Sequence, residues 1–132
     1  MTVSDDGTTT RAGEERWIAA CAAADVEDDF GTRVEVDGGQ AIAVFRVDGA
    51  YHATDDRCTH GEASLCEGLV DGNVVECPFH AGTFDIVTGK ALTFPCVVNL
   101  ATYPVRVEDG TIMVRVDAPT TIPTLLDRSE PA

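Results

Sequence analysis

The chain has little positive charge and no long apolar segment. It carries 9 Lys and Arg against 23 Asp and Glu, for a formal net charge of −14 over 132 residues. Phosphate backbones and anionic membrane surfaces would repel such a protein. No apolar run approaches the roughly 18 residues that cross a bilayer, and the acidic N-terminus lacks the basic-then-apolar layout of a signal peptide. We therefore expect a cytoplasmic protein with neither nucleic acid nor membrane as a partner.

The acidity itself has two interpretations that remain open. It either keeps the protein soluble or steers it toward basic patches on partner proteins, where surface charge mainly raises encounter rates. The chain contains five cysteines. An odd number without an export signal makes a complete disulfide framework a poor explanation. Metal binding becomes the better explanation for these cysteines.

The length and composition predict one folded domain with two tails. A chain of 132 residues with 44% hydrophobic and 24% charged residues is typical of a globular protein with a single core. Residues 1–16 are rich in Ser, Thr, Asp, Glu and Gly and have little to bury, so we expect a disordered N-terminal tail. Residues 118–132 contain three prolines and little periodicity, which predicts a second tail. The folded domain should span residues 17–117.

Short, alternating, β-branched segments divided by turn residues predict an all-β fold. Asp48-Gly49, Asp71-Gly72 and Asp109-Gly110 each lie between two such segments and are predicted as hairpin turns. Only residues 25–30 hint at a helix, of a turn or two at most. The predicted extended segments are 17–22, 33–36, 40–47, 50–54, 74–77, 83–85, 103–108 and 111–116.

Two mixed cysteine and histidine pairs, Cys58-x-His60 and Cys77-x-x-His80, are the strongest functional signal. Thiolates and imidazoles are ligands that iron and zinc prefer, and the short spacing lets two neighbouring loops close on one metal centre. Cys2His2 zinc sites usually place two Cys together and two His together. In a Rieske centre one iron takes two Cys and the other two His, so mixed pairs can give one residue to each iron. The pattern therefore favours a Rieske centre over zinc.

At these motifs the chain resembles the Rieske family, and most closely the ferredoxin components of bacterial aromatic-ring-hydroxylating dioxygenases of the naphthalene and carbazole types. The resemblance covers about residues 17–116. It implies one Rieske-type [2Fe–2S] cluster per chain, with Cys58 and Cys77 on the inner ferric iron. His60 and His80 would bind the outer, solvent-facing iron that changes valence. The matching motifs are Cys58-Thr59-His60-Gly61, Cys77-Pro78-Phe79-His80, Gly82, Phe84-Asp85, Thr88-Gly89, Tyr103-Pro104-Val105 and Asp109-Gly110.

The same resemblance implies an antiparallel β-sandwich with a cluster-binding subdomain, about residues 55–96, inserted as two hairpin loops. A third loop that bears a proline would cover the cluster, and residues 91–97 with Pro95 occupy its place. Asn99 stands where some relatives have a second proline.

Two departures from the respiratory branch of the family concern the cluster surroundings. That branch has an additional Cys in each box, and the two form a disulfide; Ala63, near that place in the first box, and Phe79 in the second cannot do so. It also has Ser and Tyr hydroxyls that hydrogen-bond the cluster, where this chain has Gly82 and Phe84. Fewer donors leave the reduced cluster less stabilised. We therefore predict a reduction potential toward the low end of the Rieske range, around −150 mV.

The resemblance implies a monomeric one-electron carrier in aromatic hydrocarbon catabolism, with no substrate-converting centre of its own. It would pass electrons from an NAD(P)H-dependent flavin reductase to the Rieske centre of a terminal oxygenase. An oxygenase would need a further iron held by two His and one carboxylate, and no His follows His80. Two alternatives remain open: the Rieske small subunit of another oxidoreductase such as a nitrite reductase, and a structural Cys2His2 zinc module.

Five further residues have simpler interpretations. Cys21, Cys66 and Cys96 could be redox-active, but free cysteine commonly behaves as a small buried apolar residue, which we favour. His52 is interpreted as a structural or surface histidine rather than a fifth ligand. Trp17 is interpreted as a core anchor at the head of the first strand.

Overall fold

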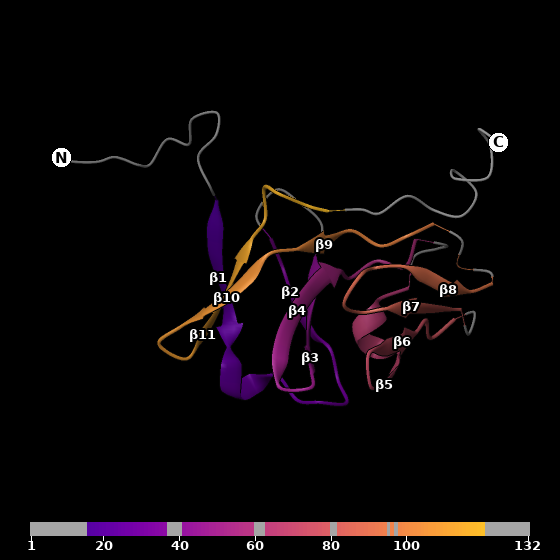
Figure 1. Ribbon diagram of the computed structural model, residues 1–132, viewed down its shortest axis with the longest axis horizontal. Helices are drawn as coiled ribbons and strands as arrows, with labels where there is room; N and C mark the ends of the chain where they lie inside the picture. The colour runs from indigo at the N-terminus through magenta and orange to yellow at the C-terminus, as the bar shows by residue number, and fades with distance from the viewer. Residues whose placement is uncertain are drawn as a thin grey trace.

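The computed structural model describes residues 16–36, 41–59, 63–79, 82–94, 96 and 98–120. In these residues the chain forms three antiparallel sheets of short strands, so the predicted all-β fold is confirmed. Figure 1 shows β1, β10 and β11 at one end of the molecule, β2, β3 and β4 in the middle, and β5 to β8 at the other end. Over the same residues, no helix has the length and apolar character needed to cross a membrane.

The first two sheets pack around one core. The first has the order β1-β11-β10 and the second the order β2-β3-β4-β9. Their shared core consists of Val26, Ile42, Val44, Ala53, Ile112 and Val114. The strand bounds are β1 (Trp17–Ala22), β10 (Val105–Glu108) and β11 (Thr111–Arg115), and β2 (Thr32–Val34), β3 (Ile42–Val47), β4 (Ala50–Asp55) and β9 (Thr102–Tyr103).

The third sheet is inserted between β4 and β9 and has the order β5-β6-β7-β8. Its strands are β5 (Leu69–Asp71), β6 (Val74–Glu76), β7 (Thr83–Asp85) and β8 (Ala91–Thr93). A 3-10 turn, η2 (Leu65–Glu67), precedes it. The insertion follows the predicted subdomain, although β5 and β8 were not among the extended segments that the sequence predicts.

Strand β3 joins the two parts of the molecule because both of its faces are buried. Successive side chains of a strand point to opposite faces. Ile42 and Val44 contribute to the core between the first two sheets. Ala43, Phe45 and Val47 contribute to the core of the inserted part. This double burial explains why β3 is apolar at nearly every position rather than at alternate ones.

The hairpin predictions are correct at two turns and one residue out at the third. Asp48-Gly49 has φ values of 52° and 82°, and Asp109-Gly110 has 52° and 79°, so both central residues adopt the left-handed conformation. At the third hairpin Asp71 still pairs with Val74 in the ladder, which makes Gly72 and Asn73 the central residues. Gly72, with φ of 63°, supplies the positive dihedral angle that this turn needs.

Other element boundaries differ from the predictions by a few residues. The helical turn η1 covers Ala23–Asp25 rather than 25–30, and β2 covers Thr32–Val34 rather than 33–36. The predicted segment 103–108 is divided at Pro104, which lacks the amide that a ladder needs. Gln40, residues 1–15 and residues 121–132 lie outside the described residues. At the start of the predicted C-terminal tail, Thr120 forms two backbone hydrogen bonds with Thr102, at 2.8 and 2.7 Å.

Candidate metal centre

Cys58 and Cys77 lie at equivalent positions in two loops that are closed in the same way. The Cys58 amide donates to the Ala63 carbonyl at 2.9 Å, and the Cys77 amide donates to the Gly82 carbonyl at 2.8 Å. Each thiol is 1% exposed, and both belong to the core of the inserted part. The structure therefore brings the two predicted sulfur ligands, far apart in sequence, into one buried region at the bases of matched loops.

The two predicted imidazole ligands, His60 and His80, lie outside the described residues. Each falls inside one of the two closed loops, because residues 58–63 and 77–82 bracket them in sequence. Among the residues that the structure describes, no group of three or more His, Cys, Asp or Glu side chains is arranged to hold a metal ion. Two of the four predicted ligands are absent from that set.

A third loop packs against both of the others. Thr59, the middle residue of the first box, donates its hydroxyl to the Val98 carbonyl at 2.6 Å. Cys96 Sγ lies 3.8 Å from Cys58 Sγ, and a Cβ on Gly82 would collide with the Cys96 sulfur. Glycine is thus needed at position 82 because a Cβ does not fit there, and not because of a positive φ angle. Cys96 and Val98 therefore contact the two cysteine loops, and Pro95 lies outside the described residues.

Asn99 closes the third loop at its base. Its side chain is buried, and its Oδ1 accepts a hydrogen bond from the Ala91 amide at 2.7 Å. Nearby, the Leu100 amide donates to the Gly89 carbonyl at 2.7 Å. The segment from Ala91 to Asn99 begins with strand β8 rather than with irregular loop. Asn99 therefore ties the two ends of the third loop together where some relatives carry a proline.

Asp56 anchors the first loop, and sequence reasoning did not identify it. Its carboxylate is buried and accepts hydrogen bonds from Ser64 Oγ at 2.6 Å, the Cys66 amide at 3.0 Å and Arg33 Nε at 3.2 Å. The Leu65 amide also donates to the Asp56 carbonyl at 2.7 Å. Asp56 thus fixes the chain on both sides of the loop that contains Cys58. A buried carboxylate tolerates burial when it is paired and hydrogen-bonded in this way.

The remaining cysteines and His52 occupy different surroundings. Burial, followed by a hydrogen bond to Asp56, raises the pKa of the Cys66 thiol, and burial followed by the nearby Asp25 charge raises that of Cys21. His52 lies on β4 opposite Phe45, and burial lowers its pKa against the opposing effect of Asp85. A lowered pKa keeps this imidazole neutral near pH 7.

Trp17 is not the core anchor that the sequence predicts. It is only partly buried, and the Arg106 guanidinium lies over its ring, 4.1 Å from the centroid. The pair is a cation–π contact on the surface of the first sheet.

Three apolar side chains stand out from the loops around the buried thiols, and we call them the apolar rim: Phe79, Phe94 and Val98. They are 66%, 82% and 49% exposed. Phe79 belongs to the second loop, and the other two belong to the third. Exposed apolar side chains mark interaction sites when they form a contiguous patch.

A shallow hollow of about 300 Å³ lies beside the first loop. It is lined by Asp55, Arg57, Cys58, Thr59 and Val98. The Tyr103 hydroxyl donates to Asp55 Oδ1 at 2.6 Å. Burial, followed by this bond, raises the pKa of the Tyr103 phenol. Strand β9 is thereby connected to the chain segment that enters the first loop.

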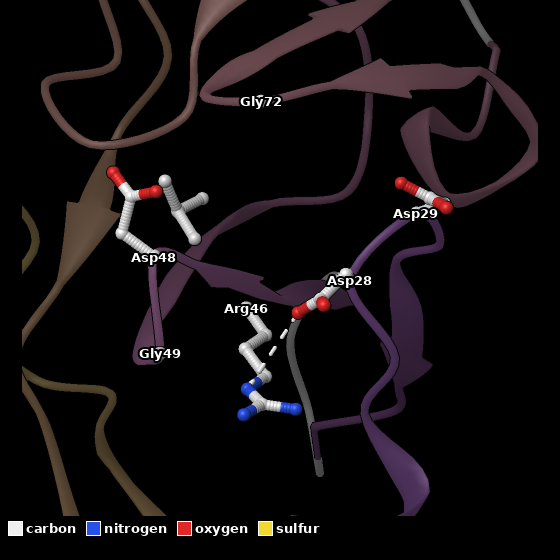
Figure 2. A pocket seen from close by; sticks show the side chains of 7 residues that line it. Asp28, Asp29, Arg46, Asp48, Gly49 and Gly72 are labelled. Carbon is white, nitrogen blue, oxygen red and sulfur yellow. Dashed lines mark ion pairs between the residues drawn. The ribbon is translucent and has the colours of Figure 1, made fainter.

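A second hollow, of about 250 Å³, lies away from the thiols and is lined mainly by Asp28, Asp29, Arg46, Asp48, Gly49 and Gly72. Figure 2 shows Arg46 and Asp28 facing each other, with Nε 3.6 Å from the Asp28 Oδ1, and Asp48 on another side. Both side chains of the ion pair are largely exposed, so the pair contributes little stability. Three carboxylates and one guanidinium line the hollow, so its lining carries net negative charge.

The chemistry of the described residues fits an iron–sulfur group. Two buried sulfurs on separate loops would suit the two thiolate ligands that such a group requires, and the sequence has one histidine within each loop. The surrounding core, with Leu65, Phe84 and Ile86 fully buried, excludes water from the sulfur side. A solvent-excluding apolar shell is one of the features that set the redox properties of a metal site.

Comparison with known proteins identifies relatives of this arrangement. A family model described as Rieske [2Fe-2S] domain matches residues 16–104. Ferredoxin CarAc from Metapseudomonas resinovorans is 45% identical over 98 residues, which cover 74% of this chain and 92% of that protein.

Two solved structures are similar as well. One is titled as the complex of reduced oxygenase and oxidized ferredoxin in carbazole 1,9a-dioxygenase. The matched chain has a TM-score of 0.72 at 44% identity, with coverage of 75% of this chain and 92% of that one. The other is described as a putative NADH-dependent nitrite reductase small subunit from Mycobacterium tuberculosis, with a TM-score of 0.67 at 29% identity, covering 76% of this chain and 95% of that one.

Proposed function

The chain belongs to the Rieske [2Fe–2S] family, and on this premise we propose that it is the electron-carrying ferredoxin of an aromatic-ring dioxygenase system. It accepts one electron at a time from an NAD(P)H-dependent flavin reductase and delivers it to the Rieske centre of a terminal oxygenase. The observation that carries the proposal is the pair of matched loops with buried Cys58 and Cys77 at their bases. Family membership also removes the structural zinc alternative.

We assign the cluster ligands to the two loops. Cys58 and Cys77 hold one iron, and His60 and His80 hold the other. When bound, a [2Fe–2S] group of this kind takes up and releases a single electron without any bond change in a substrate. The chain itself buries the sulfur side and fixes the first loop through Asp56, and Cys96 and Val98 of the third loop contact the first loop at Cys58 and Thr59.

The apolar rim supports docking of the oxygenase at the loops. Its exposed members belong to the second and third loops, and Phe79 directly precedes His80 in sequence. Small and weak interfaces suit electron carriers, which must bind and leave quickly. A related ferredoxin has been solved in complex with the oxygenase of carbazole 1,9a-dioxygenase, which supports an oxygenase as the partner here.

The second candidate is the Rieske small subunit of a nitrite reductase, which the likeness to the Mycobacterium tuberculosis protein supports. Identity to the ferredoxin solved with the oxygenase of carbazole 1,9a-dioxygenase is higher, at 44% against 29%. The two functions differ in the enzyme that receives the electron. The proposed carrier sustains oxygenation of an aromatic substrate by a separate oxygenase and gives no nitrite reduction when mixed with a nitrite reductase large subunit.

The ligand assignment is tested by single substitutions of the histidines. We expect His60→Ala and His80→Ala to lose the red-brown colour and the Rieske EPR signal of the dithionite-reduced protein, because each removes an iron ligand. His52→Ala should retain both, because His52 lies on β4 and outside both cysteine loops in sequence. If either loop variant kept a normal spectrum and full electron delivery to an oxygenase, the assignment would be wrong.

A further inference from the structure

Cys96 is a third buried thiol at the metal centre, and the proposed ligand set does not use it. It comes from the third loop, is 2% exposed, and belongs to the same core as Cys58 and Cys77. Its Sγ lies 3.8 Å from Cys58 Sγ, within the range of a hydrogen bond between sulfurs. The position is therefore close enough to influence a ligand sulfur directly.

The packing around Cys96 fixes where its sulfur lies. A Cβ on Gly82 would collide with Cys96 Sγ and would approach the Cys96 amide to 3.1 Å. The Cys96 amide itself donates to the Thr93 carbonyl at 3.1 Å. The thiol is thus enclosed between the base of the second loop and the sulfur of the first. It has little freedom to turn away from Cys58.

Metal binding decides which of the two sulfurs donates. Either thiol could donate in the metal-free chain. The thiolate is the species that ligates a metal, so Cys58 has no hydrogen left once iron is bound. We propose that Cys96 then donates its S–H to the Cys58 sulfur and acts as a positioning residue that favours the reduced cluster. This inference rests on the proposed function, because it assumes Cys58 as a ligand.

The effect on the potential has a definite sign. Reduction adds negative charge to the cluster and its ligand sulfurs, and hydrogen bonds to charged acceptors are stronger than those to neutral ones. A hydrogen-bond donor to the Cys58 sulfur therefore stabilises the reduced form more than the oxidised form, and removal of that donor lowers the reduction potential. The thiol is a weak donor, so the effect is modest.

The test is a redox titration of the holoprotein followed by EPR. For Cys96→Ala we expect the ratio of reduced to oxidised protein at a fixed potential to fall about threefold. At 59 mV per tenfold change, this fall corresponds to a reduction potential about 28 mV more negative. Cys96→Ser keeps a donor at the same position and should stay within half of that shift from the wild type. The control, Cys21→Ala, replaces another partly buried cysteine on β1 and should leave the potential unchanged.

Two outcomes would overturn the inference while leaving the proposed function intact. One is an unchanged potential in Cys96→Ala with a normal EPR signal. The other is an equal shift in Cys96→Ala and Cys96→Ser, which would mean a packing effect. Absence of a Rieske signal from the wild-type protein would instead refute the proposed function.

A second measurement applies if Cys96→Ala cannot hold the cluster. In a Cys21→Ala and Cys66→Ala background, Cys96 is the one thiol that remains once Cys58 and Cys77 ligate iron. Its S–H stretching band in the infrared should shift between the oxidised and reduced holoprotein. A band that stays fixed on reduction would refute the hydrogen bond.

Discussion

Asp56 shows how one buried charge can hold a functional loop. Its three side-chain partners, Arg33, Ser64 and Cys66, come from both sides of the first cysteine loop. Asp56→Ala leaves these donors without an acceptor, and we expect a loss of about 2 kcal/mol in the free energy of unfolding, measured by denaturant titration. The cluster should also be lost faster to a chelator.

The matched control for Asp56 is Glu35→Gln. Glu35 is the other carboxylate paired with Arg33, at 2.6 Å, but it is 72% exposed. Exposed ion pairs contribute little, so this change should alter stability by less than about 0.5 kcal/mol. Equal effects of the two substitutions would show that the Arg33 charge, and not the loop, explains the loss.

Tyr103 gives a prediction at alkaline pH. Its pKa is raised by burial and by the hydrogen bond to Asp55, so the phenol keeps its proton in the folded state at a pH where the unfolded chain has lost it. This stability is complete below the unfolded pKa of about 10 and decreases as pH rises above it. In a Tyr51→Phe protein, where Tyr103 is the one remaining tyrosine, the ultraviolet phenolate band should appear above pH 10.

Tyr103→Phe should remove this pH dependence and lower stability by about 1 kcal/mol near pH 7, which denaturant titration at several pH values can measure. A phenolate band that rises at the ordinary pH of tyrosine would mean that the bond to Asp55 does not persist in solution.

Single residues were predictable from the sequence where chemistry depends on local spacing. Cys58 and Cys77 stand out because each has a histidine two or three positions later. Asp56 does not, since its role depends on contacts with Arg33 and Ser64 that only the folded chain creates. The same holds for Cys96, which the sequence marks only as one more free cysteine.

Among the elements, the third loop is held closed by one buried side-chain amide, that of Asn99. Asn99 Oδ1 accepts the Ala91 amide, and this bond closes the segment that covers both cysteine loops. We expect Asn99→Ala to speed amide hydrogen exchange at Ala91 and cluster loss to a chelator by about tenfold, because an unsatisfied buried amide costs about 1–3 kcal/mol.

Asn73→Ala is the control for Asn99. Asn73 lies in the turn between β5 and β6, in the sheet that contains Ala91, but it is exposed and its side chain donates to Asp85 at 3.0 Å. It should change neither rate by more than about twofold. If both variants behaved alike, the third loop would not owe its closure to Asn99.

The strands that the sequence predicts bury more of their side chains than the strands that it misses. Residues 17–22 and 83–85 match β1 and β7 at both ends. Strands β5 and β8 have three residues each and bury little, so their alternation is too short to stand out from loop sequence. Their ladder partners in β6 and β7, rather than their own composition, make them strands.

For the molecule as a whole, we expect the apolar rim and the acidic surface to make separate contributions to partner binding. Phe94 is the most exposed member of the rim. We expect Phe94→Asp to raise the KM of the oxygenase for the ferredoxin about tenfold, which corresponds to about 1.4 kcal/mol, with the EPR signal and potential unchanged. Steady-state turnover at varied ferredoxin concentration measures this.

Val107→Asp is the matched control, because Val107 is also exposed and apolar but lies on β10 in the first sheet. The KM of the oxygenase for the Val107→Asp ferredoxin should stay at the wild-type value. A similar rise in both variants would point to added negative charge, rather than lost rim contact, as the cause.

The net charge of −14 predicts a salt effect that separates the two interpretations of acidity. If the charge steers the ferredoxin to a basic reductase, its rate of reduction should fall several-fold between about 0.05 and about 0.5 M ionic strength, as the Debye length shortens. Stopped-flow reduction measures that rate. A rate that does not change with salt would leave solubility as the role of the charge.

The two-faced burial of β3 limits how the electron-carrying part could be reused. A peptide cut to residues 55–96 would contain both cysteine loops but would lack Phe45 and Val47, which fill the core beneath them. Such a fragment should stay unfolded on its own. A transplant of the redox module into another scaffold would have to include β3. The other face of β3, with Ile42 and Val44, would then need a second core to pack against.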